Sequence, residues 1–382
     1  MAHSRASRTP ASRLHVTALF GAALWLAAAS CRSGNEPIVI GIAGPFAEAR
    51  GQSMLLAARL AVQEINATNM LGGRRLELDS LNDSASTTRA ITVAQQFLGD
   101  PRIVAVVGHL TSGTTIAAAD IYNSGRHPVV DVSPSASNPD LTGMSPYTFR
   151  VCATDLVHGS ELAWFAVRRL KASAAAVIYL NDDYGRGLLG AFRDEFGKLG
   201  GTITEANPML VSTADIGAYL DHIQLDGRAQ VLMIATDRAT AVVALRQIRA
   251  RGITLPIIGG DALAGIQAEG GLAEGLHLTS SWLPDLPGET NTRFLQAYTR
   301  FSGGALPDHR GAGAYDAVYL VAQAIRDAGG DRASIRNALA HMTVPFNGVT
   351  GRITFDAGGD VPNKAVHVGV VLNGRIALDT GR

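Results

Sequence analysis

The feature that most constrains this chain is a regular alternation of short apolar segments with helical segments from residue 37 onward. Residues 38–42 are almost continuously apolar, which is typical of a strand buried on both faces. Residues 52–69 carry apolar side chains at helical spacing. The same order continues with expected strands at 76–81, 103–107 and 129–132 and expected helices at 87–98 and 113–123. This order predicts a parallel, doubly wound α/β sheet with helices on both faces.

A second series of the same kind begins near Thr154. Its expected helices are 158–171, 187–199, 215–225 and 239–251, and its expected strands are 175–180, 202–205, 231–235 and 256–259. Two further helices are expected at 292–301 and 314–328. Asn347-Gly348 and Asn373-Gly374 are typical hairpin turns, next to expected strands at 353–355 and 366–372. Two α/β domains predict a ligand site between them, beyond the carboxyl ends of their strands.

The first residues have the features of an export signal. Residues 1–13 contain three arginines and no acid, and residues 14–29 are mostly apolar or small. Such a segment is typical of a secretory signal, and it is shorter than the about 20 residues of a membrane span. Cys31 follows small residues and resembles the acylated cysteine of a bacterial lipobox, although Ala28 stands where that motif usually has leucine. We expect a signal peptide over 1–30 and a lipid-anchored tether over 31–36, with ordinary signal-peptidase cleavage as the alternative.

Composition and motifs argue against several classes of function. Lysine plus arginine and aspartate plus glutamate both number 33, so the chain lacks the basic surplus of a nucleic-acid-binding protein. Two cysteines cannot build a disulfide framework or a cysteine-rich zinc site, and Cys152 is expected to be a buried thiol. No G-x-S-x-G, H-E-x-x-H or Walker motif occurs, and no two histidines have metal-ligand spacing on a helix. We therefore expect no catalytic residues, metal or cofactor, and we expect His109 to be a structural histidine.

Two loops of the first series offer hydrogen-bond donors to an anion. Residues 108–115 follow an expected strand and open a helix, so free backbone N–H groups and the helix dipole favour a negative charge there. Ser112 lies in this loop, and Ser135 and Ser137 lie in the next one. A carboxylate between the two loops would gain several charge-assisted hydrogen bonds. Ordinary N-capping of the helices by serine and threonine is the alternative interpretation.

The strand ends of the second series carry acids and one aromatic side chain. Tyr184 follows one strand, Asp237 and Arg238 follow another, and Asp261 follows a third. An acid that faces a cleft could accept hydrogen bonds from an ammonium group, and Tyr184 could stack on a ligand. The alternative, which the residues alone leave open, is that these acids cap the helices that follow.

Taken together, these segments resemble the branched-chain amino-acid (Leu/Ile/Val) binding proteins, the type I periplasmic solute-binding proteins of ABC importers. The resemblance covers residues 37–372, and the matching stretches are 40–45, 60–66, 106–109 with Ser112, 133–139, 183–187, 259–261, 314–317 and 348–351. It implies two interleaved doubly wound lobes joined by a three-segment hinge, with crossovers near 153–156, 280–284 and 350–356. Lobe 1 would comprise residues 37–154 plus 283–352, and lobe 2 would comprise residues 155–282 plus 353–382.

The resemblance also implies roles for single residues in binding an amino acid. Ser112 and Ser137 would hold the ligand carboxylate, and Ser135 would add backbone contacts. Tyr184 would be the aromatic residue of the second lobe, and Asp261 would pair with the α-ammonium group.

The wall of the expected side-chain pocket departs from the family. Arg50 and the pair Asp237-Arg238 stand where relatives often have aromatic side chains. This change predicts a ligand with a polar or charged side chain.

The function expected from this resemblance is that of the extracytoplasmic substrate-binding component of an ABC importer. The protein would be a monomer, held at the membrane through Cys31, that closes on an amino acid or similar small zwitterion and docks on permease subunits. A lipoprotein sensor that signals to a membrane partner and an exported enzyme are the alternatives.

Overall fold

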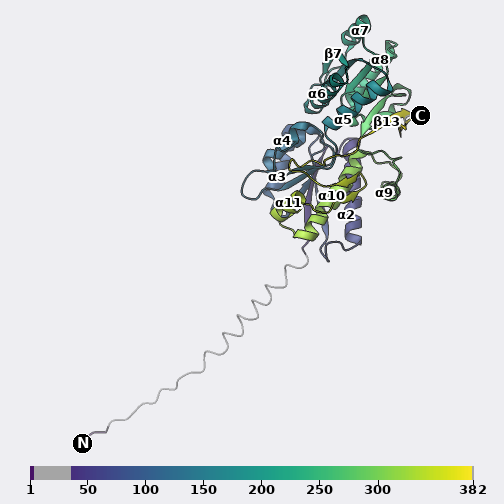
Figure 1. Ribbon diagram of the computed structural model, residues 1–382. Helices are drawn as coiled ribbons and strands as arrows, with labels where there is room; N and C mark the ends of the chain where they lie inside the picture. The colour runs from purple at the N-terminus through teal and green to yellow at the C-terminus, as the bar shows by residue number, and fades with distance from the viewer. Residues whose placement is uncertain (4–35, 381–382) are drawn as a thin grey trace.

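The structure is a computed structural model that describes residues 1–3 and 36–380. Cys31 and nearly all of the expected signal peptide therefore lie outside the described residues. The chain folds into two α/β units, which lie one above the other in Figure 1. Among the described residues, no helix combines the length and apolarity that crossing a membrane requires.

The first unit is built on a five-stranded, wholly parallel sheet in the order β2-β1-β3-β4-β5. Its strands are β1 (Ile38–Gly44), β2 (Leu76–Asn82), β3 (Ile103–Val107), β4 (Val130–Ser133) and β5 (Thr148–Arg150). The chain first goes from β1 outward to β2 and then returns to β3 on the other side of β1. Ligands of doubly wound sheets bind beyond the carboxyl ends of the strands at such a reversal. In this sheet the loops after β1 and β3 lie at that position.

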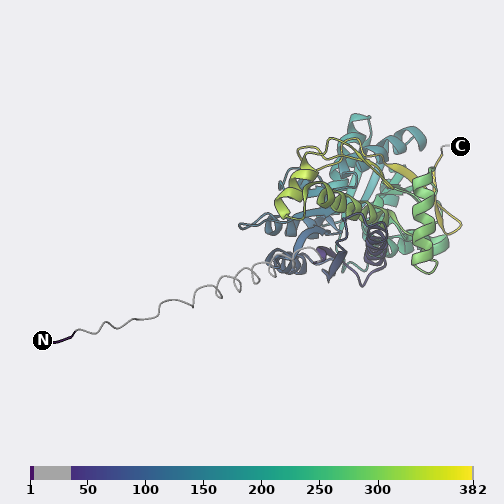
Figure 2. The ribbon, with the colours of Figure 1, turned by 90° about the horizontal axis from the view of Figure 1, so that it is seen from below.

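Helices cover both faces of this sheet. One face packs against α2 (Ala49–Ala67), α10 (His309–Ala328) and α11 (Arg332–Ala340), and α2 and α10 lie side by side in Figure 1. The other face packs against α3 (Thr87–Gly99) and α4 (Ser112–Tyr122). A further helix, α9 (Glu289–Phe301), lies at the margin of the molecule in Figures 1 and 2 and packs outside α2 through Phe294.

The second unit is built on a seven-stranded sheet in the order β14-β13-β10-β9-β8-β6-β7. Its parallel strands are β6 (Ala174–Leu180), β7 (Thr202–Met209), β8 (Val231–Ala235), β9 (Ile257–Gly259) and β10 (His277–Ser280), and its antiparallel strands are β13 (His367–Leu372) and β14 (Arg375–Leu378). One face packs against α5 (Asp155–Trp164, which continues as a wider turn, Phe165–Arg169) and α6 (Asp183–Lys198). The other packs against α7 (Gly217–Asp226) and α8 (Arg238–Ala250).

The chain passes between the two units three times: after β5, after β10 and after β12. The first two passages contain the expected crossovers near 153–156 and 280–284. The third comes later than expected, because Ile353 and Val361 lie in the core of the first unit and Lys364 Nζ donates a hydrogen bond to Thr350 Oγ1 (2.7 Å). The division into lobes stays a proposal, and this packing favours moving its last boundary from 352 to about 364.

The two expected hairpin turns have different outcomes. Asn373 and Gly374 form the turn between β13 and β14, both with positive φ (50° and 74°), so this prediction is confirmed. The prediction for 347–348 is wrong by two residues, because these residues pair within β11 (Phe346–Gly348) against β12 (Gly351–Ile353). The turn lies at Val349 and Thr350, whose N–H groups both donate to the Asp316 carboxylate (2.8 Å each).

Candidate functional site

Loops and helix starts from both units meet between the two sheets. The loop after β3 begins α4, and Thr111, whose hydroxyl accepts from the Thr114 N–H, is the N-cap. Ser112, the next residue, is buried, and its hydroxyl oxygen accepts a hydrogen bond from the Asn138 N–H (3.2 Å). This bond ties the loop after β3 to the loop after β4.

His109 is structural, as expected. Its buried ring lies between the Asp83 carboxylate (Nδ1 to Oδ2, 2.7 Å) and the Tyr122 hydroxyl (Nε2 to Oη, 3.0 Å). Both ring nitrogens therefore have protein partners, and the ring fixes the start of the loop that carries Ser112.

The capping alternative holds for some acids and not for others. Asp182 accepts from the Gly185 N–H at the start of α6, and Asp237 accepts from the Thr240 N–H at the start of α8 (2.8 Å each). Asp261 begins a short 3-10 helix, Asp261–Leu263, and makes no cap bond. Its carboxylate is buried and faces side chains from other elements instead.

Asp261 is the centre of what we call the buried polar cluster. Its Oδ1 accepts a hydrogen bond from the Tyr184 hydroxyl (3.2 Å), and its Oδ2 lies 3.4 Å from His309 Nε2 and 3.9 Å from His158 Nε2. His309 Nε2 also lies 3.4 Å from the Ser135 hydroxyl. Both units contribute to the cluster, which comprises Ser135, Ser137, Asp155, His158, Tyr184, Asp261 and His309.

Several atoms of the buried polar cluster have no hydrogen-bond partner. Of the eight buried side-chain atoms without one among the described residues, five belong here: Ser137 Oγ, both carboxylate oxygens of Asp155, His158 Nε2 and His309 Nδ1. A buried polar atom left unpaired costs about 1–3 kcal/mol, and native structures contain few of them. Their concentration between the two units indicates a place for a polar molecule.

The charges of the cluster favour a cation. Burial raises the pKa of Asp155 well above its ordinary value, and the negative charge of Asp261 raises it further. Burial also opposes ionisation of Asp261, but its pKa lies below the ordinary value because His158 and His309 are positively charged at the acidic pH where Asp261 titrates, and Arg310 is positively charged throughout. Burial lowers the pKa of His309 to about 4, so this ring is neutral at pH 7. The ionised Asp261 therefore lies near an Asp155 carboxyl group whose ionisation is disfavoured, and the histidines of the cluster are uncharged at pH 7.

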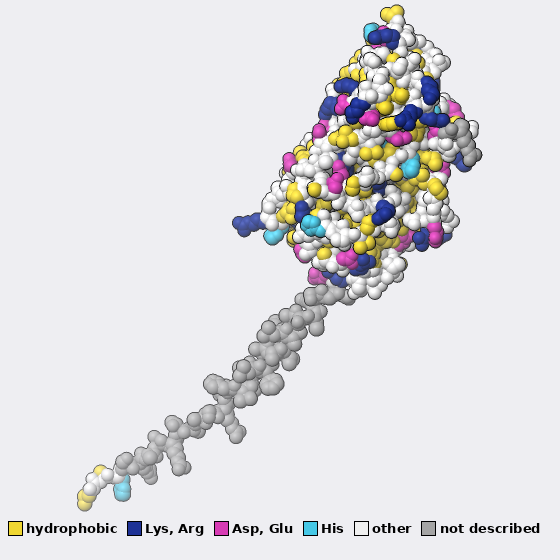
Figure 3. Space-filling model, viewed as in Figure 1, with side chains coloured by type: hydrophobic (Ala, Val, Ile, Leu, Met, Phe, Trp, Pro, Cys, Tyr) yellow, Lys and Arg dark blue, Asp and Glu magenta, His cyan; other side chains and the backbone are white. Residues whose placement is uncertain are grey.

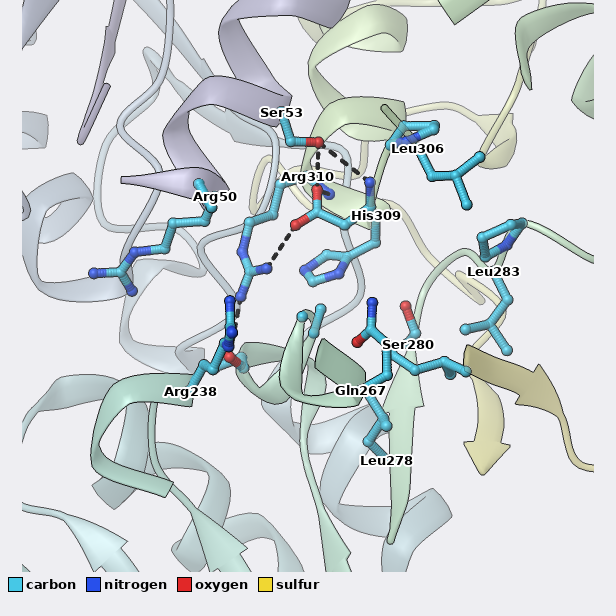
Figure 4. Close-up of a pocket in the computed structure, with 18 of the residues that line it drawn as sticks. Arg50, Ser53, Arg238, Gln267, Leu278, Ser280, Leu283, Leu306, His309 and Arg310 are labelled. Carbon is cyan, nitrogen blue, oxygen red and sulfur yellow. Dashed lines mark hydrogen bonds and ion pairs between the residues drawn. The ribbon is translucent and has the colours of Figure 1, made fainter. Parts of the chain in front are cut away.

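A cavity of about 1020 Å³ adjoins the cluster (Figure 4). Arg50 at the start of α2 and Arg310 at the start of α10 line it from the first unit, and Arg238 at the start of α8 lines it from the second. Leu278 and Leu283 form part of an apolar wall. Because the His309 side chain contacts Asp261 and also lines the cavity, the cavity and the cluster are adjoining parts of one cleft.

The residues predicted from the sequence fall into these two parts. Ser112, Ser135, Ser137, Tyr184 and Asp261 lie in or beside the buried polar cluster, and Arg50, Asp237 and Arg238 line the cavity. Whether they contact a ligand stays a prediction. Sequence reasoning missed Asp155, His158 and His309. One signal for Asp155 was available, because an acid at an expected crossover between two units is placed to face the cleft.

Among residues 1–3 and 36–380, no group of three or more histidine, cysteine, aspartate or glutamate side chains is arranged to hold a metal ion. Cys152 is free and buried, and burial raises the pKa of its thiol to about 12.

Known proteins similar to this chain support the resemblance seen in its sequence. An amino acid binding protein of Pseudomonas aeruginosa is 30% identical over 231 residues, and the match spans 59% of this chain and about three fifths (61%) of that protein's length. A solved ABC transporter substrate-binding protein from Desulfitobacterium hafniense, in complex with Leu, is 30% identical with a TM-score of 0.79, covering 90% of this chain and 99% of the other.

A second solved structure extends the comparison. It is the branched-chain amino acid transporter substrate binding protein LivJ from Streptococcus pneumoniae, in complex with isoleucine, with 27% identity, a TM-score of 0.80 and coverage of 90% and 99%. Residues 37–375 match the family model described as periplasmic binding protein. The expected fold and resemblance are therefore confirmed, and the chain belongs to the periplasmic binding protein family.

Proposed function

We propose that this protein is the extracytoplasmic substrate-binding component of an ABC importer and that it binds an amino acid or similar small zwitterion in the cleft between its two units. Membership of the periplasmic binding protein family supports the transport role. The substrate-binding proteins solved with Leu and with isoleucine support the choice of an amino acid. The observation that carries the proposal is the set of unpaired buried atoms in the polar cluster.

The two charged ends of an amino acid complement these unpaired atoms. An ammonium group donates three hydrogen bonds, and the unpaired oxygens of Asp155 together with Asp261 are suitable acceptors. The Ser137 hydroxyl, which lies beside Asp155, would donate to the ligand carboxylate. A micromolar dissociation constant needs about 8 kcal/mol, which a few charge-assisted hydrogen bonds and buried surface can supply.

The three passages between the units act as a hinge in this proposal. Residues of the two units already contact each other across the cleft. Asn138 Nδ2 donates to the Asp183 carbonyl, and Arg310 Nη2 donates to the Ala262 carbonyl (3.2 Å). Opening the hinge would admit the ligand by breaking such contacts, and closure would remove water and strengthen the charged hydrogen bonds. The closed form would then dock on permease subunits as a monomer.

Export and anchoring complete the proposal. The first 30 residues would direct export, and an acylated Cys31 would hold the protein at the membrane surface. Mass spectrometry of the protein from a membrane fraction tests this part, because an acylated Cys31 adds lipid mass to a chain that begins at residue 31. A chain cleaved elsewhere and without added lipid would contradict it.

Isothermal titration calorimetry with a panel of amino acids tests the binding function. We expect at least one member to bind with a micromolar or lower dissociation constant. Its N-acetyl derivative and its methyl ester should bind at least 30-fold more weakly, because each removes one of the two charges. Native mass spectrometry of the protein as purified identifies a ligand that it retains. If the panel and the retained material contain no zwitterion that binds, the proposal is wrong.

A further inference from the structure

The cavity beside the buried polar cluster presents hydrogen-bond donors that the protein itself does not use. Arg50 Nε donates to Glu48 Oε2 (2.7 Å), and Arg238 Nη2 donates to Glu269 Oε1 (2.7 Å). These two side chains make no other hydrogen bond to the described residues. Since a guanidinium carries five N–H donors, most donors of Arg50 and Arg238 are unused.

One acid of the same cavity, Asp308, is fully used by the protein itself. Asp308 Oδ1 accepts from Ser53 Oγ (2.8 Å) and from the N–H groups of Arg310 and Gly311 (3.1 Å each), and its Oδ2 accepts from Arg310 Nη1 (2.8 Å). Asp237 caps α8. The cavity lining contains as many acids as arginines, five of each. Its capacity to bind an anion therefore lies in the unused donors of its arginines and not in a surplus of positive charge.

Two helix starts add positive potential at the same place. Helix α2 begins at Ala49 without a side-chain cap, and helix α8 begins at Arg238, and both ends line the cavity. The amino end of a helix carries a partial positive charge and free N–H groups. Here this potential coincides with the guanidinium groups, which come from both units and lie on one side of the cavity in Figure 4.

From this arrangement we propose that the side chain of the ligand ends in an anionic group, which Arg50 and Arg238 bind from the two units when the cleft closes. The inference rests on the proposed function, because it takes the buried polar cluster as the site of the amino and carboxyl groups. The carboxylate of an acidic amino acid is the primary form of this anion, and a phosphonate has the same recognition chemistry.

The arginines also disfavour the ligands of the solved relatives. An aliphatic side chain in this cavity would remove water from the Arg50 and Arg238 guanidiniums and return no hydrogen bond, which is unfavourable for a charged group. Their existing ion pairs do not prevent a change of partner. The Arg50 and Glu48 side chains are 21% and 44% exposed, and pairs of this kind stabilise a protein little.

Calorimetry with matched ligands tests the inference. Aspartate, glutamate and 2-aminoadipate are each titrated against an uncharged amino acid of similar length: asparagine, glutamine and norleucine. Leucine and 2-amino-4-phosphonobutyrate complete the series. We expect at least one acidic ligand to bind tenfold or more tightly than its uncharged partner and than leucine. A phosphonate that binds tighter than glutamate would identify the larger anion as the preferred form.

Variants assign the effect to the two arginines. R50Q and R238Q should each reduce the acid-to-amide preference to threefold or less, mainly because the acidic ligand binds more weakly. The control is R102Q, because Arg102 is 70% exposed, pairs with Asp100 and does not line the cavity. R102Q should keep the full preference.

The outcomes separate this inference from the proposed function. If leucine, isoleucine or another uncharged amino acid binds at least as tightly as every acidic ligand, the inference is wrong and the binding function stands. If an acidic ligand is preferred and both variants keep that preference, Arg50 and Arg238 do not carry it, and the inference is again wrong. If no member of the series binds, the inference is wrong, and the proposed function is decided separately by the full amino-acid panel and the retained ligand.

Discussion

The two parts of the cleft differ in the polar atoms that they leave unpaired. In the buried polar cluster the unpaired atoms include both carboxyl oxygens of Asp155, and they lie in the interior. In the cavity, N–H donors of Arg50 and Arg238 are unused, and they lie on partly exposed helix starts. The difference indicates that one part is fixed by the fold, whereas the other can change its side chains with little effect on folding. Under the proposed function, this difference would separate recognition of the common part of a ligand from recognition of its variable part.

The surface shown in Figure 3 has no concentration of one sign of charge. In Figure 3 the basic and acidic side chains are interspersed over the face shown, as expected for a chain with 33 of each kind. The difference in unpaired hydrogen-bonding groups is therefore a local property of the cleft, which is where a small ligand would encounter it.

The largest expected effect concerns Arg150, whose buried side chain binds the chain segment next to Ser137. Its side chain is 2% exposed, Nη2 lies 3.0 Å from Asp360 Oδ2, and Nη1 donates to the carbonyl of Asn138 (2.6 Å), next to Ser137. Arg150→Met would leave the mostly buried Asp360 carboxylate without its cation, so we expect a loss of about 3–5 kcal/mol in the free energy of unfolding. Urea denaturation measures it.

A double variant checks the reason for that loss. Arg150→Met combined with Asp360→Leu removes both charges and should recover part of the stability. Equal stability of Arg150→Met and the natural chain would show that the ion pair does not support this part of the cleft.

Asp155→Asn should separate binding from stability. Burial raises the pKa of Asp155, so above its ordinary pKa the ionised group makes the ligand-free protein less stable. The variant should therefore be at least as stable as the natural chain at pH 7, while its affinity for a zwitterion falls by about 2–3 kcal/mol, or roughly 30- to 150-fold. Thermal denaturation and calorimetry measure the two effects. Asp194→Asn, an exposed change on α6, is the control and should alter neither.

Ser137→Ala should weaken binding by about 1–3 kcal/mol, because a buried ligand carboxylate would lose a donor. Stability should change little, since the only interaction of the Ser137 hydroxyl with the described residues is with the Asp155 carboxyl group, whose ionisation burial disfavours. Calorimetry with the best ligand of the panel measures the affinity. An unchanged affinity would remove Ser137 from the site.

The pH dependence of binding should follow Asp155. Binding of an ammonium group requires the ionised carboxylate, and the pKa of Asp155 is raised in the ligand-free protein. Affinity should therefore increase with pH through this raised pKa, by at most about tenfold, or about 1.4 kcal/mol, per pH unit. The charged or titratable groups that act on Asp155 or share its cluster are Arg150, His158, Asp182, Tyr184, Asp261 and His309.

Calorimetry between pH 5 and 8 tests this dependence. The histidines contribute little in the upper part of the range, because burial lowers the pKa of both His158 and His309. Asp155→Asn should abolish the slope. A slope that persists in the variant would assign the titration to another group.

The smallest expected effect is at the open part of the cleft. Arg50→Ala removes a partly exposed ion pair with Glu48, so the free energy of unfolding should change by less than about 1 kcal/mol. If Arg50→Ala lowered the free energy of unfolding as much as Arg150→Met, Arg50 would be as important for folding as the residues around the buried polar cluster. The contrast between the two parts of the cleft would then not hold.

Much of the fold could be predicted because its strands are apolar runs of buried residues. Strand β3 was expected at the residues where it occurs, whereas β5 and β10 were missed because they have only three and four residues and no clear pattern. Helices α6 and α10 begin four and five residues earlier than the apolar pattern indicates. Asp182 and Asp308 cap these starts, so capping signals would have located them better than periodicity.

The site was only partly predictable because its contacts join distant segments. Motifs placed Ser137 and Asp261, each at the end of a strand. The side chains that complete the buried polar cluster around them, Asp155 and His309, come from helices of different units. No local sequence pattern indicates that they meet. Likewise, the turn at Val349 is set by Asp316, 33 residues away, and this overrides the local preference of Asn347-Gly348.

The order of strands in the second sheet has a consequence for how the molecule matures. Strand β10 lies between β9 and β13, and β13 and β14 lie between residues 367 and 378, so the sheet stays incomplete until residue 378 has been synthesised. The first core likewise waits for Ile353 and Val361. A nascent chain of 300 residues would have neither unit finished, and neither unit corresponds to one continuous segment that could be expressed alone. Late completion of this kind suits a polypeptide that crosses a membrane before it folds.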